Sequence, residues 1–298
     1  MKNDWKQQGE RSNVFTLRLI LWIARHLGRR VTRLFLYPIV GYFLLTSPAA
    51  VRASKHYLAR VFGRPVGLRQ VARHLYCFSA TILDRVYFLT DQHSRYELQI
   101  HHREVFEQCV AQPGGCLLLG THLGSFEVLR SLAVNRRFPL KILMYREHNQ
   151  RISSLLDALN PEINDTVIDL GAENALLLTQ EALQQGYCVG MLGDRVTQGE
   201  KSLDCDLLGA RAAFPLGPLT LAAVFKVPVV LFFGLYRGGN RYDIFFEQLV
   251  ERMTADRTQR QQQVEYWTRQ YVRRIEYYVR LAPYNWFNYF DYWNDYSG

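Results

Sequence analysis

The chain has 298 residues, 48% of them hydrophobic and 21% charged, which suits one large domain or two modest ones and excludes a disordered protein. Its 20 glycines and 10 prolines exclude collagen-like and low-complexity sequence. The five cysteines are odd in number and form no Cys-x-x-Cys pair, so we expect a reducing compartment, with neither a disulfide framework nor a structural zinc site. We interpret all five as small buried apolar residues: Cys77, Cys109, Cys116, Cys188 and Cys205.

The net charge of +9 is concentrated near the N-terminus. Residues 1–75 carry a net charge of +12, and the other 223 residues carry −3. Evenly spread basicity would favour a nucleic-acid partner more strongly, and no recognisable nucleic-acid module accompanies these charges. We therefore expect no nucleic acid among the partners. The basic quarter suits anionic lipid head groups or an acidic carrier protein.

Two apolar runs occupy this basic region, at residues 14–27 and 34–51. A membrane-spanning helix needs about 20 apolar residues, and the first run is too short and carries charges. The second is near that length but is broken by Pro38, Gly41 and Pro48. Basic residues interleaved with leucines and aromatics predict helices lying in the bilayer interface. The alternatives are helices packed on the protein's own core, or a true span.

Two further helices follow. Ser47 and Pro48 are typical of a helix start, and the helix is predicted to reach Phe62, with Gly63 ending it. In the next helix, apolar residues recur at spacings of three and four from residue 68 to residue 89, which predicts a face turned to the core.

From about residue 113, short apolar runs alternate with helical patterns. This alternation predicts an α/β fold with a mixed, mostly parallel central sheet flanked by helices. The strands are expected at residues 116–120, 140–145, 165–170, 187–192, 227–236 and 242–249. The helices between them are expected near residues 123–136, 148–159, 172–186 and 216–226.

The last two strands are split by residues 237–240, whose glycines predict a hairpin at one edge of the sheet. A long helix over 256–281 follows, and Pro283 ends it before a strongly aromatic tail. We expect a helical N-terminal region over 1–112 and an α/β core over 113–298, joined as one continuous domain.

A histidine and a glutamate follow the first strand of this core. His122 stands at the carboxyl end of the strand, where α/β sheets place their ligands, and Glu127 lies about one turn into the next helix. The imidazole can fold back toward the Glu127 carboxylate, which would orient the ring and stabilise it once protonated. The alternative is a capping histidine and a glutamate favourable to the helix dipole.

Other polar groups also follow strands or precede helices. Arg146 and Asn149 come after the strand at 140–145, and Asp194 and Arg195 come after the strand at 187–192. Because carboxyl ends of parallel strands lie on one edge, these groups are expected to converge with His122.

On these residues, the sequence resembles the lysophospholipid acyltransferase superfamily, within it the late acyltransferases of lipid A biosynthesis. The resemblance covers roughly residues 10–290 and is most specific over 116–236. It extends to compact predicted acyltransferases of aryl polyene and related lipid pathways. The matching elements are the His-x₄-Glu motif of His122 and Glu127, the block of Arg146 and Asn149, the acidic Asp194, and the Phe-Pro block of Phe214 and Pro215.

Two departures leave the acceptor open. The Pro-Glu-Gly block of phospholipid enzymes is replaced by residues 193–195. The Trp-x-x-Arg-Arg pattern of lipid A enzymes is replaced by residues 284–288.

The resemblance implies a glycerol-3-phosphate acyltransferase-like fold and transfer of an acyl group from acyl carrier protein or coenzyme A to a hydroxyl or amine of a lipid or glycolipid. His122 would be the general base and Glu127 would hold its tautomer, with no cofactor and no metal. Arg146 and Arg195 would bind phosphopantetheine phosphate or the oxyanion, or form structural ion pairs. The other expected substrate-binding residues are Asn149, Asp194, Phe214 and Pro215. We expect a peripheral or monotopic protein at the cytoplasmic face of the inner membrane.

Two other classes compete with this interpretation. One is a non-catalytic lipid-binding protein on the same scaffold, against which the His122 and Glu127 pair speaks. The other is a glycosyltransferase with an Asp-x-Asp metal site. Asp204 and Asp206 have that spacing, but nothing near them supports diphosphate binding, and we expect them to be an exposed pair in a loop.

Overall fold

The computed structural model describes residues 28–90, 92–129, 138–145, 165–197, 199–253 and 258–293. The apolar run at 14–27, the helix expected at 148–159 and the second half of the helix expected at 123–136 lie outside these residues, as do Arg146 and Asn149.

The centre of the protein is a seven-stranded sheet in the order β1-β9-β8-β2-β5-β3-β4. Its neighbouring strands are parallel except for β8 and β9, which form an antiparallel hairpin. The predicted mixed, mostly parallel sheet is therefore confirmed. The strands are β1 (Glu97–His101), β2 (Cys116–Gly120), β3 (Leu140–Met144), β4 (Val167–Asp169), β5 (Cys188–Leu192), β8 (Val229–Gly238) and β9 (Arg241–Val250).

Three strands were not predicted. The edge strand β1 pairs with β9, so the region over 1–112 contributes to the same sheet as the core. The other two, β6 (Ser202–Leu207) and β7 (Ala210–Pro215), form a separate antiparallel hairpin. Asp204 and Asp206 are exposed as expected, but they lie in β6 and not in a loop.

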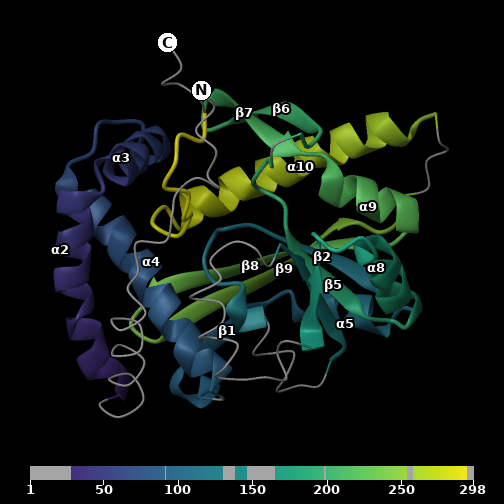
Figure 1. Ribbon diagram of the computed structural model, residues 1–298, viewed down its shortest axis with the longest axis horizontal. Helices are drawn as coiled ribbons and strands as arrows, with labels where there is room; N and C mark the ends of the chain where they lie inside the picture. The colour runs from purple at the N-terminus through teal and green to yellow at the C-terminus, as the bar shows by residue number, and fades with distance from the viewer. Residues whose placement is uncertain are drawn as a thin grey trace.

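Helices cover both faces of the sheet. Figure 1 shows α2, α3 and α4 together at one end of the molecule, at the left, while α10 crosses the top beside α9. The predicted bounds of α3 and α4 match those observed. The helices are α2 (Leu36–Thr46), α3 (Pro48–Phe62), α4 (Leu68–Leu89), α5 (Arg103–Ala111), α8 (Ala175–Gln184), α9 (Gly217–Phe225) and α10 (Arg260–Leu281).

Alternate residues of the central strands enter two separate cores, because successive side chains of a strand point to opposite faces. In β2, Leu117 and Leu119 join the core beneath α3, α8, α9 and α10, whereas Cys116 and Leu118 join the core beneath α4 and α5. All four side chains are fully buried. A strand covered on both faces has a continuous apolar sequence, which explains why β2 was predictable.

The chain turns sharply between α2 and α3. Pro48 occupies the first turn of α3, and the helices over Gly28–Thr46 and Pro48–Phe62 are bent by 99° at the break. Within the described chain, no helix taken alone has the length and apolar composition to cross a membrane, although this bent pair meets those two criteria jointly.

Cys109 and Cys116 form a disulfide, which the prediction of five unpaired cysteines did not include. The turn between α5 and β2 contains Gly114 and Gly115, both with positive φ, and it brings the two Cα atoms within 6.3 Å. The prediction is therefore wrong for this pair. The other three cysteines are free and buried, as expected: Cys77, Cys188 and Cys205.

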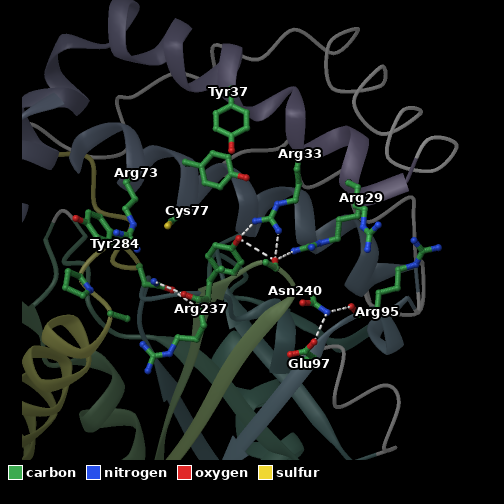
Figure 2. A pocket seen from close by; sticks show the side chains of 18 of the residues that line it. Arg29, Arg33, Tyr37, Arg73, Cys77, Arg95, Glu97, Arg237, Asn240 and Tyr284 are labelled. Atoms are coloured by element: carbon green, nitrogen blue, oxygen red, sulfur yellow. Dashed lines mark hydrogen bonds between the residues drawn. The ribbon is translucent and has the colours of Figure 1, made fainter. Parts of the chain in front are cut away.

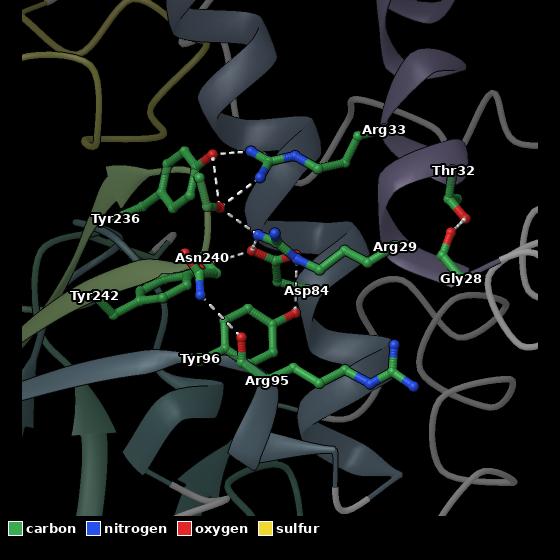
Figure 3. Close-up of polar contacts among 11 residues, drawn as sticks. Gly28, Arg29, Thr32, Arg33, Asp84, Arg95, Tyr96, Tyr236, Asn240 and Tyr242 are labelled. Atoms are coloured by element: carbon green, nitrogen blue, oxygen red, sulfur yellow. Dashed lines mark hydrogen bonds and ion pairs between the residues drawn. The ribbon is translucent and has the colours of Figure 1, made fainter.

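A buried ion pair holds the N-terminal helical region to the sheet (Figure 3). Arg29 donates from Nε and from a terminal nitrogen to the two oxygens of Asp84, at 2.8 and 2.9 Å. Tyr242 of β9 donates to the same carboxylate at 2.9 Å. Burial opposes the charge of Arg29, but Asp84 and Tyr96 outweigh it and raise the pKa of the guanidinium. The contacts of Arg29 therefore join the helical segment Gly28–Thr46 to α4 and to the sheet.

Candidate active site

The candidate site begins where β2 and β5 end. These neighbouring parallel strands are in register, with Gly120 opposite Leu192. Gly193 N–H donates to the Gly120 carbonyl at 3.0 Å, so the two chains stay together beyond the strands. The same register continued by two residues places His122 beside Asp194.

His122 is bound to Asp194 by its ring and by its main chain. Nδ1 lies 2.7 Å from Oδ1 of Asp194, and the main-chain N–H of His122 lies 3.1 Å from each carboxylate oxygen. The Asp194 side chain is fully buried, whereas 29% of the His122 side chain is exposed. No described residue forms a hydrogen bond to the other ring nitrogen, Nε2. The imidazole is therefore held at one nitrogen and open at the other.

The C-terminal segment supplies further donors to the carboxylate. Trp286 Nε1 donates to Oδ2 of Asp194 at 3.0 Å, and Asn288 Nδ2 donates to the same oxygen at 3.3 Å. Tyr292 donates to the Asp194 main-chain carbonyl at 2.5 Å. Hydrogen bonds of this kind compensate for burying a charge.

The surroundings fix the charges of the pair. Burial opposes the charge of Asp194, but His122, Arg195 and Trp286 outweigh it and lower the pKa of this carboxyl well below its usual range. Burial and the neighbouring Arg195 lower the pKa of His122 below 6.5, and Asp194 only partly offsets them. At neutral pH the pair is thus a carboxylate and a neutral imidazole, the state needed by a general base.

Glu127 has a different partner from the one expected. Its carboxylate accepts a hydrogen bond from Arg85 of α4 and is 5% exposed, and the only carboxylate bonded to the His122 ring among the described residues is that of Asp194. Residues five apart do not share a helix face, and the strand register brings Asp194 closer. The expected pairing of His122 with Glu127 is therefore replaced by a pairing with Asp194.

Arg195 is directed into the protein beside this pair. Its Nε donates to Asn288 Oδ1 at 2.8 Å, a terminal nitrogen donates to the Phe287 carbonyl at 3.0 Å, and the guanidinium lies over the Phe290 ring. Burial lowers the pKa of Arg195, which Asp194 partly offsets. These contacts tie the C-terminal segment to the site.

Phe214 and Pro215 end β7 and are buried. The Phe214 ring packs edge-on against Tyr292 at a centroid distance of 5.9 Å. Since Tyr292 bonds the main chain of Asp194, this block supports the site from the β6–β7 hairpin.

The turn after His122 depends on a close main-chain approach. Gly124 has φ +79°, its N–H donates to the Asn285 carbonyl at 2.8 Å, and a Cβ there would lie 2.0 Å from the Gly234 carbonyl oxygen. The turn thus joins the site to β8 and to the C-terminal segment.

Sequence reasoning missed the supporting residues Arg85, Trp286, Asn288 and Tyr292. The aromatic tail was a signal for the last three, but nothing local to it indicates a partner. Among the described residues, no group of three or more histidine, cysteine, aspartate or glutamate side chains could hold a metal ion.

A sequence model of a family described as bacterial lipid A biosynthesis acyltransferases matches residues 9–293. Among curated proteins, none matches the chain. The family match spans the His122 turn, Asp194 and the C-terminal segment that binds it.

Proposed function

Because the chain belongs to the bacterial lipid A biosynthesis acyltransferase family, we propose that it transfers a fatty acyl group from a thioester to a hydroxyl or amine of a lipid or glycolipid, with His122 as general base. Membership itself implies acyl transfer to a lipid acceptor. The donor, acyl carrier protein or coenzyme A, and the identity of the acceptor belong to the proposal.

In the proposed step, Nε2 of His122 takes the proton of the acceptor hydroxyl as its oxygen attacks the thioester carbonyl carbon. The tetrahedral intermediate then collapses, the carbon–sulfur bond breaks, and the imidazolium returns its proton to the leaving thiolate. Asp194 accepts from Nδ1–H throughout, which fixes the tautomer and stabilises the imidazolium. The thioester is already activated, so the proposal needs no acyl-enzyme intermediate.

The observation that carries this proposal is the asymmetry of the His122 ring. Nδ1 is bonded to a buried carboxylate, while Nε2 has no partner among the described residues and part of the side chain is exposed. This arrangement suits proton transfer at Nε2.

Glu127 has a positioning role in this proposal. Its ion pair with Arg85 ties the start of the helix after His122 to α4. The role first expected of Glu127, orienting the imidazole, passes to Asp194.

Association with the inner membrane at its cytoplasmic face is also part of the proposal. Large apolar side chains of α2 are exposed, among them Tyr37, Tyr42 and Leu45. Their exposure suits a helix that lies against lipid.

The test is transfer of a labelled acyl group into membrane lipids, measured separately with acyl carrier protein and coenzyme A donors. Asp194→Asn and His122→Ala should each abolish most of the product. Glu127→Gln should reduce it less than Asp194→Asn does. The matched control is Asp206→Asn in β6, whose exposed carboxylate lies outside the site.

Loss of product in the Glu127 variant alone, with Asp194→Asn fully active, would overturn the assignment of the two carboxylates. Equal product from wild type and His122→Ala would overturn the mechanism. Wild-type protein that binds lipid but transfers no acyl group from either donor would favour the non-catalytic lipid-binding alternative.

A further inference from the structure

A cavity lies between the N-terminal helical region and the β8–β9 hairpin, as an open cleft of about 1470 Å³ (Figure 2). Six arginines and a single carboxylate, that of Glu97, line it. His122 and Asp194 do not line the cleft, so its charges are not explained by the chemistry proposed above.

Some of these arginines have carboxylate partners and others do not. Arg29 is paired with Asp84, and Arg237 is paired with Asp243 at 2.7 Å. Arg33 and Arg73 have no carboxylate partner among the described residues. The cleft therefore keeps an excess of positive charge after its internal ion pairs are counted.

Arg33 is held in place by neutral oxygens only. It donates to the Gly239 carbonyl and to the Tyr236 hydroxyl, while its own Nε is buried without a partner in the described chain. A guanidinium held in this way is preorganised to receive an anion.

Arg73 reaches the cleft from α4. Its guanidinium lies 4.5 Å from the ring centroid of Tyr284 and forms no hydrogen bond with a described residue. In Figure 2 the side chains of Arg33 and Arg73 extend from two different helices toward the hairpin, with Cys77 between them. Two guanidiniums that line one cleft and have no carboxylate partner among the described residues suit a phosphate group.

One rim of the cleft is apolar. Leu34 and Tyr37 line it, and each is 64% exposed. Leu45 follows Leu34 by eleven residues, which is about three helical turns and places it on the same side of the helix. Leu45 is 86% exposed. A ligand with a phosphate in the cleft would have an apolar track beside it for hydrocarbon chains.

We propose that this arginine cleft binds the phosphate head group of an anionic membrane lipid, with Arg33 and Arg73 contacting the phosphate and the lipid chains lying along Leu34, Tyr37 and Leu45. The charge selects an anion, and the exposed apolar track selects a lipid over a soluble phosphoester. The site is separate from the His122 pair and does not depend on acyl transfer.

The test measures binding of dihexanoylphosphatidylglycerol, below its micellar concentration, to the full chain by titration calorimetry. Arg73→Gln should weaken binding about tenfold or more, because it removes one charge-assisted contact but none of the hydrogen bonds of the fold. Arg73→Lys should restore most of the affinity, since it keeps the charge. Arg273→Gln, an exposed arginine of α10, is the matched control and should bind as wild type does.

Glycerol 3-phosphate distinguishes a lipid site from a site for soluble phosphoesters. It should bind at least tenfold more weakly than the lipid, and Leu34→Ser should weaken binding of the lipid only. Wild-type affinity in Arg73→Gln, with an unchanged melting temperature, would overturn the site. If glycerol 3-phosphate binds as tightly as the lipid does, the assignment of the cleft to a lipid is wrong.

His122→Ala should bind the lipid as tightly as wild type does. If the proposed acyl-transfer chemistry is wrong, the measured affinity for the lipid is therefore unaffected. If the cleft does not bind lipid, the outcome of the acyl-transfer test is likewise unaffected.

Discussion

The indole of Trp286 donates a 3.0 Å hydrogen bond to the carboxylate of Asp194, across 92 residues of sequence. Trp286 is itself fully buried. The carboxylate that holds His122 is thus stabilised by a side chain from the aromatic tail, and the tail becomes part of the site.

Trp286→Phe keeps the aromatic packing and removes this donor. We expect kcat to fall about tenfold with little change in KM, and the free energy of unfolding to fall by about 1.5–3 kcal/mol, the usual worth of a hydrogen bond to a charged group. Steady-state kinetics and urea unfolding measure the two effects. Trp267→Phe, on the partly buried face of α10, is the control, and an equal loss of kcat in both variants would contradict the assigned role.

Under the proposed mechanism, the pH dependence of catalysis reports the environment of His122. Because burial and Arg195 lower the pKa of His122 below 6.5, kcat/KM should rise with pH along a limb centred below 6.5 and then reach a plateau. Asp194 partly counters that shift, so Asp194→Asn should move the limb to still lower pH and lower the plateau about a hundredfold or more. A limb that moves upward in this variant would be inconsistent with the pairing.

A second histidine makes stability depend on pH. His74 is fully buried between Ser54 Oγ, 2.8 Å from Nδ1, and the Trp286 carbonyl, 2.9 Å from Nε2. Burial lowers the pKa of His74 from 6.5 to about 4, although its bond to Trp286 opposes this. Between those values the unfolded chain holds the extra proton, so the free energy of unfolding falls as pH decreases, by about 3 kcal/mol in all.

Urea unfolding of wild type and His74→Gln at pH 7 and pH 4.5 tests this dependence. The variant should be less stable at pH 7 but should lose less stability on acidification than wild type does. Identical pH slopes for the two proteins would rule out His74 as a source of the effect.

The close approach at Gly124 predicts a strong effect of a single methyl group. Gly124→Ala would place Cβ 2.0 Å from the Gly234 carbonyl oxygen at a positive φ, and we expect a loss of about 3 kcal/mol or more in the free energy of unfolding. Gly186→Ala is the matched control, since Gly186 has φ +83° but nothing within 4 Å, and it should cost only about 1–2 kcal/mol. Equal losses would mean that backbone conformation alone matters at Gly124.

The ion pair of Arg29 and Asp84 is expected to be costly to break from one side. Arg29→Gln leaves a fully buried carboxylate without its charge partner, and the free energy of unfolding should fall by about 3–5 kcal/mol. Arg269→Gln removes an exposed pair with Glu265 and should cost less than about 1 kcal/mol. Thermal or urea unfolding separates the two outcomes, and similar small losses would show that water replaces the guanidinium.

The parts of this fold that sequence could predict are those with local periodicity. The α4 helix has apolar residues at helical spacing over its whole length, and β2 and β8 are continuous apolar runs because both faces are covered. The strand β1 was missed because it is a five-residue edge strand with exposed Glu97 and Gln99. The hairpin of β6 and β7 was missed because its polar residues suggest a loop.

The site was only partly predictable for a similar reason. His122, Asp194 and the strand ends that carry them could be located from the sequence, because each follows an apolar run. Their pairing depends on the register of β2 against β5, which is set by contacts between distant segments. Glu127 was the nearest carboxylate in sequence, but Asp194 is the one that the register brings to the ring.

The sheet order has a consequence for how the protein is made. The central strand β2 lies between β5 and β8, so it acquires its second neighbour only after more than 100 further residues have been synthesised. Trp286 and Asn288 are made later still, and until then the carboxylate of Asp194 lacks two of the donors that compensate for its burial. The full set of hydrogen bonds to the Asp194 carboxylate can therefore form only after the chain has been synthesised past Asn288 and this segment has left the ribosome.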